Sequence, residues 1–415
     1  MTNKTQTVKA AVGKVKQASL QLAAVSTLDK NKALKNIIEK LNEKKDEIFL
    51  ENNNDIEAAK KENISEVLIS RLLLDYKKFN DLIKGLKDLI NLEDPVGKII
   101  SELEMDKDLI LKQVACPIGV IGVIFEARPE ALVQIASLCL KSGNAVVLKG
   151  GSEAIRSNKI LFEIFVEGSK GILPDNWIYL LESREEVQEI LKLDCYIDLL
   201  IPRGSNKFVK FIKDNTKIPV LGHADGICHI YVDKEADLEM AEKIVIDAKC
   251  QYPAVCNAVE TLLVHKSLVK SFLPVMKKEL ENHGVKIKEG AKGIEYNDLI
   301  ISINVVDSFA EAVEHINTYS SGHTEAIITQ NKEKAEKFMR EVDASSVMWN
   351  CSTRFSDGYR FGKGAEVGVS TNKIHARGPV GMEGLLIYKY KLYGNGQIVK
   401  DYVEGRSKFT HKLRK

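Results

Sequence analysis

The chain has 415 residues, of which 44% are apolar, and its 60 Lys and Arg residues nearly balance 58 Asp and Glu residues, for a formal charge of +2. The length predicts two or three domains with a sizeable core, and the charge balance argues against nucleic acid or another polyanion as a partner. No apolar run approaches the roughly 18 to 20 residues of a membrane span, and the first residues lack the apolar core of a secretory signal.

Helical patterns fill about the first 95 residues. Ser26 and Thr27 can cap one helix, and apolar side chains recur after them at helical spacing, at Leu34, Ile37, Ile38 and Leu41. The segment 93–97 contains Pro95 and Gly97 and ends the helical region. Two extended runs around a polar turn then predict a β-hairpin over 98–116.

Strands and helices alternate from 118 to about 232. Apolar runs predict strands at 118–125, 144–148, 177–181, 197–201 and 227–232, with helices beginning at Pro129 and near Ser152. Such strands, separated by helices, are typical of a parallel sheet that is covered on both faces. A second α/β unit follows over about 235–350, and its predicted elements are helices at 238–250 and 309–317 and strands at 260–264, 300–306 and 325–329. A further extended run covers 385–393.

The seven cysteines are odd in number and form no C-x-x-C pair, which argues for a reducing cytosol and against a disulfide framework or a zinc site. Cys256 stands out because it lies on a loop, 251–257, between a predicted helix and a predicted strand. A thiol on such a loop can be exposed, and nearby backbone N–H groups can stabilise an oxyanion. The alternative for any one cysteine is a buried structural thiol. Eight scattered histidines without an H-E-x-x-H pattern predict no metal site.

Two strand-to-helix turns are candidates for phosphate or cofactor binding. Gly204 and Ser205 open a helix after a strand, where the helix N-terminus can accept a phosphate. Lys149 ends a strand, at the edge where open α/β sheets bind ligands. The alternative for Gly204 and Ser205 is an ordinary strand-to-helix turn. The alternative for Lys149 is a solvated lysine beside a turn, and no G-x-G-x-x-G fingerprint supports a dinucleotide site there.

Three loops carry arginines that can recognise carboxylate or phosphate, around Arg128, Arg354 and Arg377. The alternative for each is a structural ion pair. The basic segment 406–415 is most simply a solvated end, without nucleic-acid binding.

Together these stretches resemble the gamma-glutamyl phosphate reductases of the aldehyde dehydrogenase superfamily. The resemblance covers essentially the whole chain, and its motifs are 94–97, 117–129, 141–144, 149–153, 201–204, 223–229, the Cys256 loop and 352–358. The most specific part is a signature spacing of Ala312, His315, Ile316, Tyr319, Ser320, Ser321, His323, Thr324 and Glu325. The chain also resembles the reductase half of the pyrroline-5-carboxylate synthases, without their kinase half.

The resemblance implies an aldehyde dehydrogenase-like α/β fold with a Rossmann-type cofactor domain, an α/β catalytic domain and a small β oligomerisation extension. The expected boundaries are 1–232 for the NADP-binding domain, with 98–116 in the extension, 233–370 for the catalytic domain, and 371–415 for a return to the cofactor domain and an oligomerisation tail. The implied site residues are Cys256 and Asn257 for catalysis, Lys149, Ser152, Gly204, Ser205 and Glu295 for the cofactor, and Arg128, Ser352, Thr353, Arg354 and Arg377 for the substrate.

The implied reaction is the NADPH-dependent reduction of L-glutamyl 5-phosphate to L-glutamate 5-semialdehyde through a Cys256 thioester, the second step of proline biosynthesis from glutamate. Three departures from the superfamily pattern bear on it. The segment 220–223 lacks the water-activating Glu of hydrolytic members, Ser152 replaces the Glu of NAD-preferring members, and the oxyanion-hole Asn falls at about Ala127.

The expected protein is a cytoplasmic homo-oligomer. A transient contact with glutamate 5-kinase is a candidate interaction, and the sequence leaves open whether that kinase hands over the acyl phosphate directly. Two alternatives remain open from the sequence. One is a hydrolytic NAD-dependent aldehyde dehydrogenase, and the other is a non-catalytic scaffold or kinase-binding protein that keeps the fold.

Overall fold

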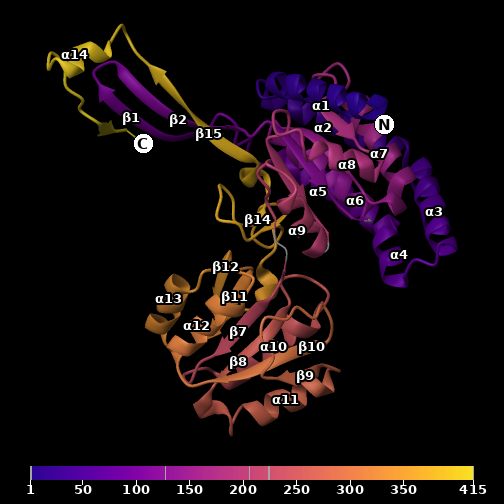
Figure 1. The fold of residues 1–415 in the computed structure, drawn as a ribbon, viewed down its shortest axis with the longest axis vertical. Coiled ribbons are helices and arrows are strands. Elements are labelled where there is room, and N and C mark those ends of the chain that lie inside the picture. Colours follow the sequence, from indigo (N-terminus) through magenta and orange to yellow (C-terminus); the bar gives the residue numbers. More distant parts are fainter. Residues whose placement is uncertain (1, 127, 205, 223–224, 415) are drawn as a thin grey trace. The chain divides into compact units, whose positions relative to one another are not determined.

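The computed structural model describes residues 2–126, 128–204, 206–222 and 225–414, with only the backbone described at 2–6 and 67. The chain forms two compact units (Figure 1). The first comprises 1–204, 212–220 and 381–415, and the second comprises 205–211 and 221–380. Among the described residues, no helix is both long and apolar enough to cross a membrane.

The first unit begins with a helical region, as the sequence predicts, and this region comprises five helices. Ser26 is the N-cap of α2, and its hydroxyl accepts the N–H of Asp29 at 3.1 Å. The predicted apolar stripe of α2 is buried, with Leu34, Ile37 and Leu41 fully enclosed. The five helices are α1 (Thr2–Leu22), α2 (Thr27–Glu43), α3 (Lys45–Lys61), α4 (Glu66–Leu72) and α5 (Tyr76–Asn91).

A parallel sheet in the order β5-β4-β3-β6 forms the core of the first unit. Its strands β3 and β4 are buried along their whole length, which explains their continuous apolar sequence. Lys149 is the last residue of β4 and therefore lies at the carboxyl edge of this sheet. The elements of this part are β3 (Val120–Ile124), α6 (Pro129–Lys141), β4 (Ala145–Lys149), η1 (Ser152–Ala154), α7 (Ile155–Ser169), β5 (Ile178–Leu180), α8 (Arg184–Ile190) and β6 (Leu199–Pro202).

The predicted strand at 227–232 exists, but the expectation that it belongs to this first sheet is wrong. It is β7 (Cys228–Val232), which pairs with β8 and β11 in the sheet of the second unit. An apolar run predicts a buried strand without specifying its neighbours, because the same pattern suits any doubly covered parallel sheet.

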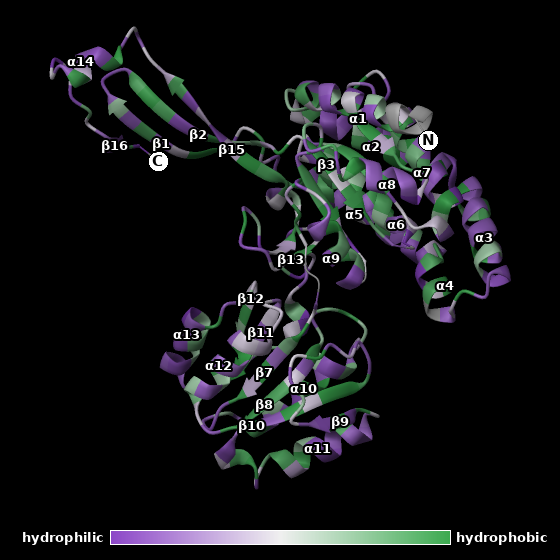
Figure 2. Cartoon of the chain, viewed as in Figure 1, coloured by the Kyte–Doolittle hydropathy of each residue, from purple (hydrophilic) through white to green (hydrophobic). Residues whose placement is uncertain are grey.

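The second unit contains a six-stranded parallel sheet in the order β12-β11-β7-β8-β10-β9. Neighbouring residues of its strands enter different cores, as the alternation of a strand requires. Ile230 and Leu262 lie in a core with α10 and α11, while Tyr231 and Leu263 lie in a core with α12 and α13. Figure 2 shows the hydrophobic colouring along β8 and β10.

The predicted elements of the second unit correspond to β7, β8, β10, β11, α10 and α12, and the structure adds others that were not predicted. The strands are β7, β8 (Val259–His265), β9 (Lys286–Glu289), β10 (Ile300–Val306), β11 (Thr324–Ile328), β12 (Ser346–Trp349) and the antiparallel pair β13 (Gly368–Ser370) and β14 (Gly378–Val380). The helices are α10 (Leu238–Cys250), η2 (Lys266–Leu268), α11 (Leu273–Asn282), α12 (Phe309–Tyr319), α13 (Lys332–Glu341) and η3 (Thr353–Phe355). Helix α9 (Asn206–Asp214) contributes residues to both units.

The predicted hairpin is confirmed as β1 (Ile99–Asp106) and β2 (Leu109–Pro117), and it belongs to an antiparallel sheet in the order β15-β2-β1-β16. Strand β15 (Leu386–Tyr393) pairs with β2 along its whole length and lies at the edge of the sheet (Figure 1). Most of its side chains are exposed, including Tyr388 and Tyr390. The remaining elements are η4 (Met382–Leu385), α14 (Val399–Val403) and β16 (Lys412–Leu413).

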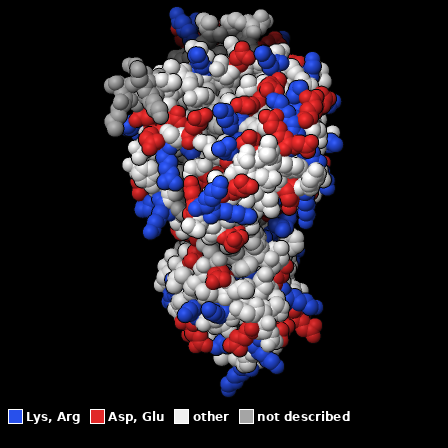
Figure 3. Space-filling model, turned by 90° about the vertical axis from the view of Figure 1, so that its right-hand side faces the viewer, with Lys and Arg blue, Asp and Glu red and all other residues white. Residues whose placement is uncertain are grey.

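The compact units divide the chain at 221 and 381, whereas the domains expected from the sequence divide it at 233 and 371. The functions assigned to those domains stay predictions. Acidic and basic side chains are interspersed on the face drawn in Figure 3, in keeping with the balanced charge.

Candidate active site

Cys256 lies on a loop, residues 251–258, that joins the end of α10 to the start of β8. Pro253 follows the helix closely and disfavours its continuation. The loop therefore lies at the amino edge of the second sheet, because β8 begins directly after it. Cys256 is partly exposed there.

Gly226 packs directly against the backbone of Cys256. A Cβ added at Gly226 would lie 2.4 Å from the Cys256 carbonyl oxygen, 2.5 Å from its Cα and 2.7 Å from its Cβ. These atoms belong to backbone or sit next to it, so they cannot swing aside as the end of a flexible side chain can. Only glycine fits between this segment and the Cys256 loop.

A second cysteine holds the same backbone. The Cys228 thiol donates a hydrogen bond to the Cys256 carbonyl oxygen at 3.2 Å, at the start of β7. Burial raises the pKa of Cys228 well above its usual value, so this thiol stays protonated and can donate. Burial likewise raises the pKa values of Cys116, Cys139, Cys250 and Cys351.

Asn257 and Thr353 attach the loop to η3. The Asn257 side chain donates to the Ser356 carbonyl at 2.9 Å, and the Thr353 hydroxyl donates to the Asn257 carbonyl at 2.7 Å. The Asn257 side-chain oxygen is buried without a hydrogen-bond partner among the described residues. The Ser352 hydroxyl accepts the N–H of Arg354 at 3.3 Å and caps η3.

Arg354 is 8% exposed and lies beside the Cys256 loop. Its Nε donates to the Gln251 side-chain oxygen at 3.0 Å, which attaches it to the residue that follows α10. Burial lowers the pKa of Arg354, the nearby charge of Arg360 lowers it further, and Cys256 acts in the opposite direction. No protein partner is recorded among the described residues for its two terminal nitrogens, which leaves them able to bind an anion.

Arg377 forms a structural ion pair, which the sequence left open as the alternative to substrate binding. Its guanidinium donates to an Asp343 carboxylate oxygen at 2.8 Å, and Lys373 also pairs with Asp343. These two cations lower the pKa of Asp343, with the Lys373 hydrogen bond as the larger cause and Arg377 as the next. Arg128 is the N-cap residue of α6, in the first unit, where it is partly exposed.

The signature spacing forms a buried polar network at the amino edges of β7 and β11. One Glu325 oxygen accepts the backbone N–H of His229 at 2.8 Å and contacts its ring Nδ1 at 3.1 Å, and the other accepts the Ser320 hydroxyl at 2.6 Å. The Ser321 hydroxyl accepts the N–H of Ile227 at 2.9 Å. These bonds fix 227–229, the segment that follows Gly226, which gives a physical reason for the motif.

Glu295 is predicted as a cofactor residue, and the structure gives its carboxylate two protein partners. It accepts the backbone N–H of Gly226 at 2.9 Å and the Asn206 side chain at 3.1 Å. Gly204 precedes α9, as predicted, and Ser205 lies outside the described residues. Sequence reasoning placed Gly226 and Cys228 within a family motif without assigning them a role, although a glycine beside a functional loop is itself a signal of close backbone approach.

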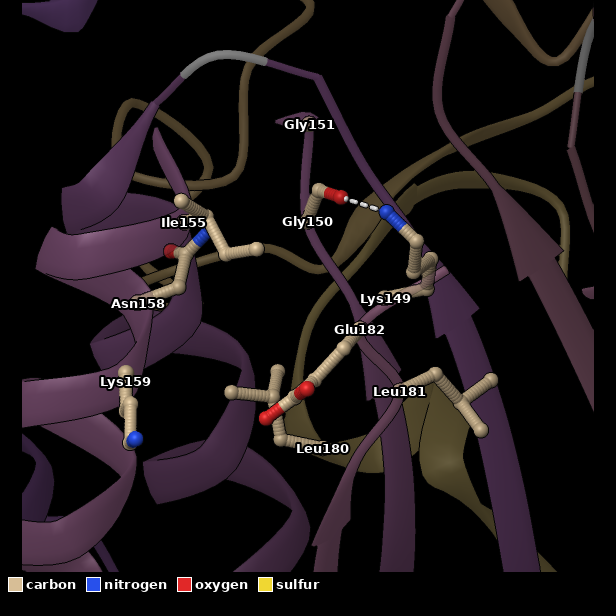
Figure 4. Close-up of a pocket in the computed structure, with 9 residues that line it drawn as sticks. All are labelled: Lys149, Gly150, Gly151, Ile155, Asn158, Lys159, Leu180, Leu181 and Glu182. Atoms are coloured by element: carbon tan, nitrogen blue, oxygen red, sulfur yellow. Dashed lines mark hydrogen bonds between the residues drawn. The ribbon is translucent and has the colours of Figure 1, made fainter. Parts of the chain in front are cut away.

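The first unit has a separate pocket at the carboxyl edge of its sheet (Figure 4). Lys149 lines it together with Gly150 and Gly151, and its ammonium donates to the Gly150 carbonyl at 2.5 Å. Burial lowers the pKa of Lys149. Asn158 and Lys159 from α7 and Glu182 after β5 line the rest of the pocket.

Two features distinguish the polar wall of this pocket. A Cβ at Gly150 would lie 2.1 Å from the Asn158 side chain, so the bare glycine backbone keeps this wall of the pocket open. The Asn158 side-chain oxygen is buried without a hydrogen-bond partner among the described residues, which leaves an acceptor for a ligand. Ser152 lies exposed at the start of η1, and its hydroxyl is 3.4 Å from the Glu153 carboxylate.

Comparisons with known proteins agree with this architecture. The model of the aldehyde dehydrogenase family matches residues 2–292 and 300–373. The gamma-glutamyl phosphate reductase of Acetivibrio thermocellus is 56% identical over 413 residues, which cover 96% of each chain. The crystal structure of the gamma-glutamyl phosphate reductase of Thermotoga maritima has a TM-score of 0.92 at 42% identity, with 94% of this chain and 99% of that one covered.

An engineered glycolyl-CoA reductase with bound NADP+ shares the fold alone, with a TM-score of 0.67 at 14% identity over 92% of this chain and 96% of that one. The matches confirm the α/β fold class expected from the sequence.

The packing at Gly226 makes a direct prediction. We expect Gly226→Ala to displace the Cys256 backbone, at a stability cost of about 1–3 kcal/mol for the added methyl group. Because access to the thiol depends on the loop, the rate of Cys256 alkylation by iodoacetamide should change by roughly tenfold, as measured by peptide mass spectrometry. Wild-type alkylation together with a wild-type Tm would show that the two segments are not in contact.

Proposed function

Because the chain belongs to the gamma-glutamyl phosphate reductases of the aldehyde dehydrogenase family, we propose that it reduces L-glutamyl 5-phosphate to L-glutamate 5-semialdehyde with Cys256 as the nucleophile. It is an oxidoreductase of proline biosynthesis by this membership. The observation that carries the nucleophile assignment is the partly exposed Cys256 on a loop held by Gly226, Cys228 and Thr353.

In the proposed reaction, the Cys256 thiolate attacks the acyl carbon of the substrate. The C–O bond to phosphate breaks, phosphate leaves with the electron pair, and a thioester forms on Sγ. Bound NADPH supplies a hydride to the acyl carbon. The resulting thiohemiacetal collapses to the aldehyde and returns the thiolate, so no water is needed and the missing water-activating Glu is consistent with the chemistry.

Arg354 is the substrate cation that the structure favours. It is buried beside the Cys256 loop with its terminal nitrogens available, whereas Arg377 is already paired with Asp343. The hydroxyls of Ser352 and Thr353 make hydrogen bonds within η3 and to the Cys256 loop. Their main proposed role is therefore to hold these segments in place, and substrate binding is a secondary role.

For the cofactor, we propose NADPH, held in part by Lys149 and the bare backbone of Gly150 in the pocket of the first unit. Ser152 in place of a Glu removes a charge that would repel a 2′-phosphate. Gly204 and Ser205 at the start of α9 are proposed pyrophosphate contacts. Because the Glu295 carboxylate already accepts two protein donors, a cofactor contact from it must share them.

A cytoplasmic homo-oligomer is also part of the proposal. Seven free cysteines suit a reducing compartment. The edge strand β15 carries exposed Ile387, Tyr388, Tyr390 and Leu392, and an unpaired apolar edge of this kind is suited to a second copy. A transient contact with glutamate 5-kinase stays a prediction.

The test of the function is phosphate-dependent oxidation of the semialdehyde, followed by NADPH absorbance. We expect activity that requires both phosphate and NADP, and we expect Cys256→Ala to abolish it while Tm stays near wild type. Activity without phosphate would indicate the hydrolytic alternative. Substantial activity of Cys256→Ala would refute the nucleophile assignment, and inactivity of the wild type would favour the scaffold alternative.

The cofactor preference can be tested at Ser152. We expect the wild type to prefer NADPH over NADH in kcat/KM, and Ser152→Glu to reduce that preference by about tenfold, since one charge contact is worth about 1–2 kcal/mol. Ser152→Ala is the matched control, because it changes the side chain without adding charge. Equal kcat/KM values for the two cofactors in the wild type would contradict the proposal.

Arg354 and Arg377 form a matched pair for substrate binding. Arg354→Ala should raise KM for the semialdehyde by roughly 10- to 150-fold, the equivalent of a charge-assisted hydrogen bond worth about 1.5–3 kcal/mol, with NADP affinity nearly unchanged. Arg377→Ala should leave KM close to wild type, because its guanidinium is engaged by Asp343. Steady-state kinetics of both variants provide the test. A larger rise in KM for Arg377→Ala than for Arg354→Ala would assign substrate binding to Arg377 instead.

A further inference from the structure

A fully buried ion pair closes the loop that carries Cys256. The Lys249 ammonium lies 2.8 Å from a Glu260 carboxylate oxygen, with side-chain exposures of 0% and 1%. Lys249 is in the last turn of α10 and Glu260 is the second residue of β8, so the pair joins the two ends of the loop 251–258. Burying both charges is costly unless each is fully partnered, which raises the question of what this pair does.

The second oxygen of Glu260 extends the contact to another segment. It accepts the backbone N–H of Asn297 at 3.2 Å, and the backbone of Tyr296 also bonds to this carboxylate. Residues 296–297 directly follow Glu295, whose carboxylate accepts the N–H of Gly226. Gly226 in turn packs against the Cys256 backbone with no room for a side chain. The contacts therefore run from Glu260 to Cys256 by two routes, one through the loop ends and one through Gly226.

We propose that Glu260, paired with Lys249, is a positioning residue that fixes the Cys256 nucleophile from both sides. This inference rests on the proposed role of Cys256. It assigns Glu260 no contact with the substrate, because the carboxylate is buried and its oxygens are occupied by Lys249 and the 296–297 backbone.

The chain offers a matched control in the first unit. Lys30 and Asp94 form another buried pair at 2.9 Å, with side-chain exposures of 1% and 6%. This pair joins α2 to the segment after α5 and has no link to the Cys256 loop among the described residues. Breaking it costs stability for the same physical reason, so it separates a loss of stability from a loss of positioning.

The decisive variant removes both charges of the loop pair. Replacing a buried ion pair by apolar side chains of similar size often preserves stability, so Lys249→Met with Glu260→Met should fold while the acceptor for the 296–297 backbone is lost. Glu260→Gln is the second variant, because it keeps the shape and one acceptor oxygen but leaves Lys249 without its charge partner. Burial raises the pKa of Glu260 to about 7 despite Lys249, so all assays are run at pH 8, where the wild-type carboxylate is ionised.

We expect the double variant to keep a Tm close to wild type, while kcat falls by roughly tenfold or more and KM for the semialdehyde changes by less than about threefold, the pattern of a misplaced nucleophile. The rate of Cys256 alkylation by iodoacetamide should also change by at least about threefold, because access to the thiol depends on the loop. Lys30→Met should lower Tm and leave the Cys256 alkylation rate unchanged.

A wild-type alkylation rate in the folded double variant would overturn the positioning role, and so would an equal change in Lys30→Met. If the double variant fails to fold, Glu260→Gln tests the positioning role instead, by the kcat and KM values and by the rate of Cys256 alkylation. The alkylation assay needs no substrate, so its result stands whether or not the wild type proves to be a phosphate-dependent reductase.

Discussion

The contact between Gly226 and the backbone of Cys256 is the constraint on which the position of the Cys256 loop depends. Two backbone segments can approach this closely only if one residue has no side chain, and both must then be held in place. Glu295 and Ser321 hold the Gly226 segment, while Cys228 and Thr353 hold the Cys256 loop. The family motifs of this unit therefore mainly hold in place the loop that carries the Cys256 thiol.

The two units place their chemistry at opposite edges of their sheets. In the first unit, Lys149 and its pocket lie at the carboxyl edge, where ligands usually bind in open α/β sheets. In the second unit, Cys256, Gly226 and the Glu325 network lie at the amino edges of β8, β7 and β11. The loops that enter the strands of the second sheet thus carry the proposed nucleophile, at the edge opposite to the one where the general rule for such sheets expects a ligand.

Local elements could be predicted from the sequence because each has its own signal. The Ser26 cap, the bounds of α10 and the hairpin of β1 and β2 follow from short-range patterns. The sheet to which β7 belongs could not be predicted, because an apolar strand sequence does not specify which strands it pairs with. The position of Cys256 on a loop before a strand could be predicted, but the pairing of Glu295 with Gly226 and of Arg377 with Asp343 depends on contacts between distant segments.

Strands β2 and β15 pair with each other, although residues 221–380 of the second unit separate them in the sequence. Residues 221–380 emerge from the ribosome before β15 and β16, so the parallel sheet of the second unit has all its strands while the antiparallel sheet still lacks two. Closing so long a loop is entropically costly and slow, whereas compact units tend to fold as they appear. The order of translation therefore lets the unit with Cys256 fold before β15 is made. The exposed apolar edge strand forms only after that unit is complete.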